Sequence, residues 1–298
     1  MVRPMRRRDW LRIAGGSALL AVACGRSGGT DVADETETAA VGDDAAEVQA
    51  DVQASDAAET GGGIPASWAA GGTAAMTAKA SYPDPFVALG PGCALLCATT
   101  DGPCTTPTSP LRVDVSEGQP GLPVRLLLRL QDVDCAPVAG AEVWIWHTDV
   151  RGVYSGPTPD PPRCYGADPA APEAMYFRGR QETDADGRVA FDTCFPGFYP
   201  SRAVHIHVQI RLADAATHTG QVFFDDALIS EIFGSHPDYA PFGLPKTRIP
   251  TDGVLAGEPD LAPLLLQHQR MSDGAMLAWK TLTVRSSLLA QDPRICGA

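Results

Sequence analysis

The chain has 298 residues, a net charge of −13 and eight cysteines. This acidic balance, without a basic stripe anywhere along the chain, argues against nucleic acid as a partner. After a polar N-terminal region, about 215 residues remain, which suits one domain with a sizeable core.

The N-terminus has the pattern of an export signal. Arg7 and Arg8 precede an acidic residue, an aromatic, a leucine and a further arginine, as in a twin-arginine signal. The apolar run over 13–23 is too short to span a bilayer. It ends at Cys24 in a context that resembles a lipoprotein processing site. Residues 1–24 are therefore predicted to be a signal peptide with lipidation at Cys24, which would tether the protein to a membrane. An ordinary cleavable signal with an incidental cysteine is the alternative, and both readings predict export to the periplasm or the cell surface.

Residues 25–81 are rich in Ala, Gly, Thr, Asp and Glu and contain few large apolar side chains. Such a composition cannot bury enough apolar surface to fold by itself. We predict a disordered acidic linker over 25–81, followed by a domain over 82–298.

The domain contains short runs that alternate apolar and polar residues between turns rich in Gly, Pro and Asp. The expected strands are 122–132, 141–149, 184–193, 201–210, 221–226 and 275–284. This series, with no long amphipathic helix, predicts an all-β fold, an antiparallel β-sandwich. Two long proline-rich segments, 155–177 and 236–262, are expected to be functional loops.

The cysteines fit an exported protein, in which they usually pair as disulfides. If Cys24 is lipidated, an odd number remains. Cys194, at the end of a predicted strand, is the candidate for a free buried thiol. The spacing defines no connectivity, and no pair of CxxC motifs indicates a zinc site.

The stretch SRAVHIHVQI (201–210) contains two histidines two residues apart. In a strand, Val204, Ile206 and Val208 would share one apolar face, while His205 and His207 would share the other. Two imidazoles so placed can converge on one metal ion, but they can equally well decorate a strand.

Four further residues near strand ends each have a simple structural explanation. Tyr154 could be a turn tyrosine, Tyr199 a corner tyrosine, Arg202 a surface charge and Gln221 a residue at a strand edge.

Taken together and in this order, these motifs resemble the intradiol ring-cleavage dioxygenases, the non-haem Fe(III) enzymes typified by protocatechuate and catechol dioxygenases. The resemblance covers most of 92–284 and is dense from 137 to 226. The motif W-x-x-D-x-x-G-x-Y occurs as WHTDVRGVY (146–154), PG-x-Y as PGFY (196–199), and R-x-x-H-x-H begins at Arg202. The family glutamine falls on Gln221.

The resemblance implies that Fe(III) is held by Tyr154, Tyr199, His205 and His207. Two tyrosinates are hard anionic donors, which suits a ferric ion better than zinc. The implied reaction cleaves a catechol-type aromatic with O2 to a cis,cis-muconate-type diacid. In it Tyr199 accepts a substrate proton, while Arg202 stabilises negative charge on the ring.

Gln221 is expected to position the substrate from behind the metal ligands.

Two other interpretations of the sequence remain open. One is a non-catalytic β-sandwich that binds a ligand, and the other is a protein whose HxH pair binds copper or zinc.

Overall fold

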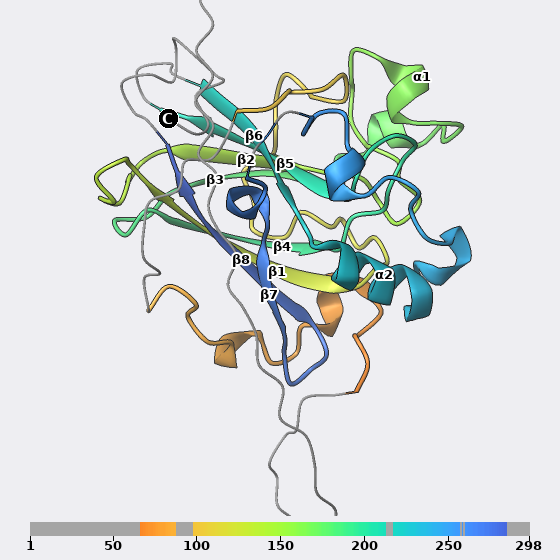
Figure 1. The fold of residues 1–298 in the computed structure, drawn as a ribbon, viewed down its shortest axis with the longest axis horizontal. Coiled ribbons are helices and arrows are strands. Elements are labelled where there is room, and N and C mark those ends of the chain that lie inside the picture. The colour runs from red at the N-terminus through yellow and green to blue at the C-terminus, as the bar shows by residue number, and fades with distance from the viewer. Residues whose placement is uncertain (1–65, 88–97, 213–216, 257, 259, 285–298) are drawn as a thin grey trace, which may run out of the picture. The chain divides into compact units, whose positions relative to one another are not determined.

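The computed structural model describes residues 66–87, 98–212, 217–256, 258 and 260–284. Its strands form two four-stranded sheets that lie face to face (Figure 1). We call β4-β1-β8-β7 the supporting sheet and β3-β2-β5-β6 the site sheet. The strands are β1 (Pro123–Gln131), β2 (Glu142–Trp146), β3 (Arg178–Glu182), β4 (Arg188–Cys194), β5 (His205–Arg211), β6 (Thr217–Phe223), β7 (Gln267–Arg270) and β8 (Met276–Thr283).

The core lies between the sheets and follows the alternation of the sequence. In β1 every second residue from Val124 to Leu130 is buried, while the residues between them are partly exposed or less deeply buried. In β5 the residues Ile206, Val208 and Ile210 are buried in the same core. The all-β sandwich predicted from the period-two pattern is therefore confirmed.

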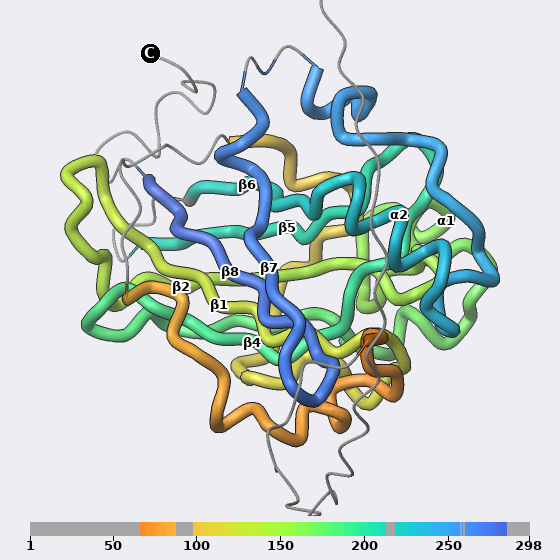
Figure 2. Tube along the Cα trace, turned by 60° about the horizontal axis from the view of Figure 1, so that its bottom comes forward, coloured from red at the N-terminus to blue at the C-terminus, as the bar shows by residue number. Residues whose placement is uncertain are grey.

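One pair of neighbouring strands departs from the antiparallel arrangement. β1 and β8 run parallel, with Val124 opposite Met276 and Gln131 opposite Thr283. Figure 2 shows the two strands side by side in the middle of the supporting sheet. The reason is topological, because β8 enters between β1 and β7 as the last strand instead of returning from β1 through a hairpin.

Over the residues that the structure describes, helices are few and short. The α-helices are α1 (Pro161–Cys164) and α2 (Asp226–Ser235). The 3-10 turns are η1 (Gly72–Ala75), η2 (Lys79–Ser81), η3 (Ala171–Glu173), η4 (Ala240–Phe242), η5 (Ile249–Thr251) and η6 (Ala262–Leu264). In the described part of the chain, no helix is long and apolar enough to cross a membrane.

The predicted strand over 221–226 stops at Phe223, because the next residues begin α2. The side chain of Asp225 accepts hydrogen bonds from the backbone nitrogens of Ala227 and Leu228, which caps the helix. The helix buries four apolar side chains in the core: Leu228, Ile229, Ile232 and Phe233.

Residues 66–81, which we assigned to the linker, are in contact with the domain. The Ala69 nitrogen donates to the Gly274 oxygen at 2.8 Å, and the Ala78 nitrogen donates to the Asp273 carboxylate at 2.8 Å. The boundary predicted at 82 is thus too late, since this polar segment finds partners on the domain that composition cannot reveal. The predicted signal peptide, Cys24 and the rest of the linker lie outside the described residues.

Cys194 is the free, buried thiol expected from the sequence. Burial raises the pKa of this thiol to about 12, so it stays protonated at neutral pH. It is therefore an unreactive core residue.

Candidate metal centre

The two histidines lie at the start of β5, an inner strand of the site sheet. His207 is opposite Trp146 on one side and Gln221 on the other. The first six residues of β5 are all buried, on both faces of the strand. The face that carries the histidines is thus covered by loops instead of facing solvent.

The two tyrosines come from loops that touch backbone to backbone. A Cβ atom at Gly152 would overlap the Phe198 carbonyl oxygen, and one at Gly197 would overlap the Asp149 carbonyl oxygen. The Gly197 nitrogen also donates to the Asp149 oxygen at 3.0 Å. Glycine at these two positions permits the close approach that brings Tyr154 and the following PGFY tyrosine together.

Four side-chain donor atoms meet at one point: the phenol oxygens of Tyr154 and Tyr199 and the Nε2 atoms of His205 and His207. Five of the six separations among them are 3.2–3.4 Å. Donors spaced in this way around one centre lie about 2.0 Å from it, the bond length of first-row metal ions to imidazole and oxygen ligands. The residues therefore fit a single metal ion.

The surroundings of the two histidine rings also suit metal binding. The Nδ1 atom of His205 lies 2.6 Å from the Ala203 carbonyl oxygen. A carbonyl only accepts, so Nδ1 carries the proton and Nε2 presents a lone pair to the centre. The ring of His207 stacks on Trp146, with centroids 4.6 Å apart and an interplanar angle of 8°.

Burial controls the charge of all four donors. It lowers the pKa of His205 to about 3 and that of His207 well below its ordinary value. It raises the pKa of Tyr154 well above its ordinary value and also raises that of Tyr199. The imidazoles are therefore neutral and ready to coordinate, whereas a tyrosinate here requires a strongly charged cation beside it.

Within the described residues, no group of three or more His, Cys, Asp and Glu side chains is arranged to hold a metal ion. A site built from those ligand types alone is thus not found there. The tyrosines are needed to complete the donor set.

Arg202 is fixed beside this centre by two partners. Its Nε donates to both carboxylate oxygens of Asp252 at 3.0 Å, and its Nη2 donates to the Oε1 of Gln221. Its Nη1 lies 3.3 Å from the phenol oxygen of Tyr199. Gln221 donates in turn to the Thr100 carbonyl oxygen at 3.1 Å. All six residues singled out in the sequence thus lie together.

Asp252 is a residue that motif reasoning missed. Its side chain is fully buried, and it also accepts from the backbone nitrogens of Ala203 and Val254 at 2.9 Å. It lies in the segment 236–262, and its pairing with Arg202 supports the functional role expected for that loop. The only signal in the sequence was the length of the loop.

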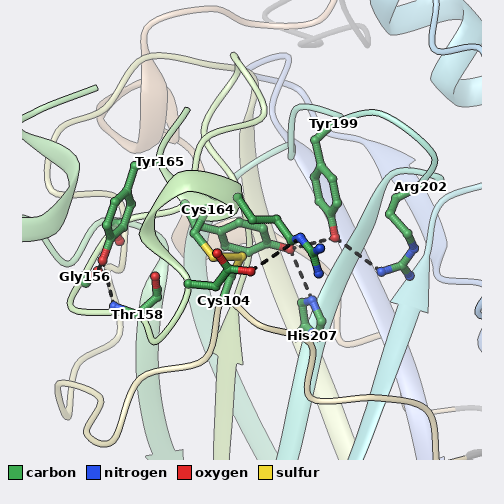
Figure 3. The surroundings of a disulfide bond; sticks show 12 residues. Cys104, Gly156, Thr158, Cys164, Tyr165, Tyr199, Arg202 and His207 are labelled. Carbon is green, nitrogen blue, oxygen red and sulfur yellow. Dashed lines mark hydrogen bonds and ion pairs between the residues drawn. A yellow bond between two sulfur atoms is a disulfide. The ribbon is translucent and has the colours of Figure 1, made fainter. Parts of the chain in front are cut away.

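A disulfide joins Cys104 to Cys164 next to Tyr154, across a sequence separation of 60. Figure 3 shows it among the side chains of the centre, with Tyr199, Arg202 and His207 to one side. The backbone nitrogen of Tyr154 donates to the Cys164 carbonyl oxygen at 2.9 Å. The bond therefore ties the loop that carries Tyr154 to the loop that carries Cys104.

Comparisons with known proteins place these observations in context. A family described as "Dioxygenase" matches residues 102–233, which include all six residues. An intradiol ring-cleavage dioxygenase from Tetranychus urticae is 30% identical to this chain, with a TM-score of 0.56. The match covers 65% of this chain and 95% of the Tetranychus protein. The dioxygenase Tetur07g02040 is 29% identical, with coverages of 65% and 95% and a TM-score of 0.53. No curated protein sequence matches the chain significantly.

Proposed function

The chain belongs to the intradiol ring-cleavage dioxygenase family, and we propose that it binds Fe(III) and cleaves a catechol-type ring between its two oxygenated carbons. Both atoms of O2 would enter the product, a cis,cis-muconate-type diacid. The observation that carries the proposal is the convergence of two phenol oxygens and two imidazole nitrogens, with five of their six separations at 3.2–3.4 Å.

The ion would be held by Tyr154, Tyr199, His205 and His207. Two phenolates are hard donors, so this set favours a ferric ion over zinc or copper. A ferric ion would act as a Lewis acid that binds both oxygens of the catechol and makes the ring susceptible to O2.

As a phenolate on the ferric ion, Tyr199 would accept a proton from the incoming catechol. Its side chain is partly exposed, whereas Tyr154 is fully buried, so Tyr199 is the phenol that a substrate can reach. The guanidinium of Arg202, 3.3 Å from its oxygen, stabilises negative charge at the same place.

Gln221 would position the substrate through Arg202. It is completely buried, accepts from the guanidinium and donates to the Thr100 carbonyl oxygen. Asp252 fixes the opposite edge of the same guanidinium. Arg202 is therefore held in one orientation before the substrate arrives, which lowers the cost of organising the site.

The first test is the colour of the purified, iron-loaded protein. We expect a red-brown protein with a broad visible band from tyrosinate-to-iron charge transfer. Tyr154→Phe and Tyr199→Phe should each shift or bleach this band. Tyr82→Phe is the matched control, because Tyr82 bonds Asp273 on another part of the domain and should leave the band unchanged.

The second test is the product formed from catechol. Oxygen uptake should match the formation of a muconate that carries both atoms of isotope-labelled O2. A semialdehyde product would contradict intradiol cleavage. A colourless protein that binds only zinc would refute the iron site. It would favour the alternative in which the HxH pair binds zinc or copper.

We further propose that the protein is exported by the twin-arginine route and anchored to a membrane through Cys24. The disulfide between Cys104 and Cys164 supports export, because such bonds persist mainly in oxidising compartments. Replacing Arg7 and Arg8 by lysine should keep the protein in the cytoplasm. Cys24→Ala should allow export but release the protein from the membrane fraction, and unchanged fractionation would refute the anchor.

A further inference from the structure

Arg178, the first residue of β3, is a buried cation next to the metal centre. It is only 2% exposed, and its residue type is rarely buried without a charged partner. Among the described residues, no carboxylate oxygen lies within 4 Å of its guanidinium nitrogens. A buried charge without a counterion is costly, so other groups must stabilise it.

The guanidinium joins the two backbone segments on either side of Tyr154. Its Nε donates to the Ser155 carbonyl oxygen at 2.8 Å, and its Nη2 donates to the Cys104 carbonyl oxygen at 2.7 Å. Cys104 is also linked through its sulfur to Cys164, whose carbonyl accepts from the Tyr154 nitrogen. Tyr154 is thus enclosed by a ring of connections in which Arg178 is the only charged member.

The same guanidinium faces the aromatic ring of Tyr154. Its central carbon is 5.9 Å from the ring centroid, within the range of a cation–π contact. If Tyr154 binds Fe(III), this ring carries negative charge, and the Arg178 guanidinium is a cation in contact with it. The Arg178 guanidinium, which has no carboxylate partner among the described residues, then has the Tyr154 phenolate as its anionic partner.

We propose that Arg178 is a positioning residue for Tyr154, which fixes the loop of this ligand and places a permanent cation against its ring. The proposal rests on the iron site of the proposed function. Two separable effects follow. The hydrogen bonds to Ser155 and Cys104 govern how tightly the metal is bound, while the charge governs the energy of the charge-transfer band. The cation stabilises the ring electrons that charge transfer removes, so its loss should move the band to longer wavelength.

Three variants test this in the full-length protein. Arg178→Met removes both the charge and the hydrogen bonds, and we expect a band at longer wavelength and roughly 10- to 100-fold weaker iron binding in chelator competition. Arg178→Lys keeps the charge but cannot donate in the same geometry to both carbonyls, so iron should bind more weakly with the band near its original position. Arg180→Met is the matched control, because Arg180 lies two residues further along β3 and pairs with Glu142. It should change neither readout.

A double-mutant cycle decides whether Arg178 acts through Tyr154. In a Tyr154→Phe background, Arg178→Met should cause little further loss of iron affinity. An equal loss in both backgrounds, or an unshifted band in folded, iron-loaded Arg178→Met, would overturn the proposal and leave Arg178 a purely structural residue. If Arg178→Met does not fold, the same cycle with Arg178→Lys distinguishes the two outcomes. A wild-type protein that binds no iron would refute the proposed function itself, and a coloured wild type with no ring cleavage would refute only the activity.

Discussion

Removal of the disulfide between Cys104 and Cys164 should destabilise the domain measurably. The bond closes a loop of 60 residues. In the chain-entropy description, cross-linking a loop of this size lowers the entropy of the unfolded chain enough to contribute about 4 kcal/mol to stability at 25 °C. For a domain of this size, that corresponds to a fall in Tm of about 8 to 16 °C.

The assay is thermal unfolding of the double variant Cys104→Ala with Cys164→Ala, followed by circular dichroism. Cys194→Ala is the matched control, because it removes a buried sulfur without removing a cross-link. Iron affinity should fall along with Tm. The disulfide holds Cys164 in place, and the Cys164 carbonyl oxygen accepts from the backbone nitrogen of Tyr154. A Tm that falls no further than in the control would refute the loop-entropy reasoning.

Three further outcomes are expected. Asp252→Asn weakens the buried ion pair of Arg202, so the free energy of unfolding in urea should fall by about 3 kcal/mol, and turnover should fall more than iron affinity; equal losses of both would contradict a role through Arg202. Gly102→Ala strains a backbone at φ +68 and places a Cβ 3.4 Å from the ring of His207, so iron affinity should drop roughly tenfold, and unchanged affinity would argue against this loop as a cover of the site. Burial lowers the pKa of His147 from 6.5 to about 4, so this residue is neutral when folded and takes up a proton more readily when unfolded. Its contribution, up to about 3 kcal/mol, is present above pH 6.5 and lost as the pH falls towards 4. The slope of stability against pH should be smaller in His147→Gln, and an identical slope would refute the assignment.

The strands of the core were predictable because burial leaves a period of two in the sequence. In β1 and β5 the alternation of apolar residues marks the face that packs between the sheets. The centre was predictable as a set of motifs, because each tyrosine motif contains a glycine that the fold requires. Gly152 and Gly197 lie where the two tyrosine loops touch backbone to backbone. The burial of the histidines was only half predictable, since it depends on loops that cover the outer face of β5.

Other parts of the molecule leave no such trace. β7 has the sequence QHQR and pairs with β8 alone at a sheet edge, where its side chains stay partly exposed and carry no apolar pattern. β3 contains Gly179, and its charged residues hide its pairing with β2. Asp252 lies far along the chain from Arg202, so only the folded loop brings the two together.

The parallel pairing of β1 with β8 has a consequence for how the protein folds during synthesis. All four strands of the site sheet are available once residue 223 has been made. β6 pairs with β5, which directly precedes it in the sequence. The supporting sheet, by contrast, lacks an inner strand until residue 283, because β8 lies between β1 and β7. Pairs as distant as Val124 and Met276 form slowly, since a long loop must close before they gain contacts. The half of the sandwich that carries the centre can therefore assemble early on the ribosome, while the last strand commits the whole domain to its native state.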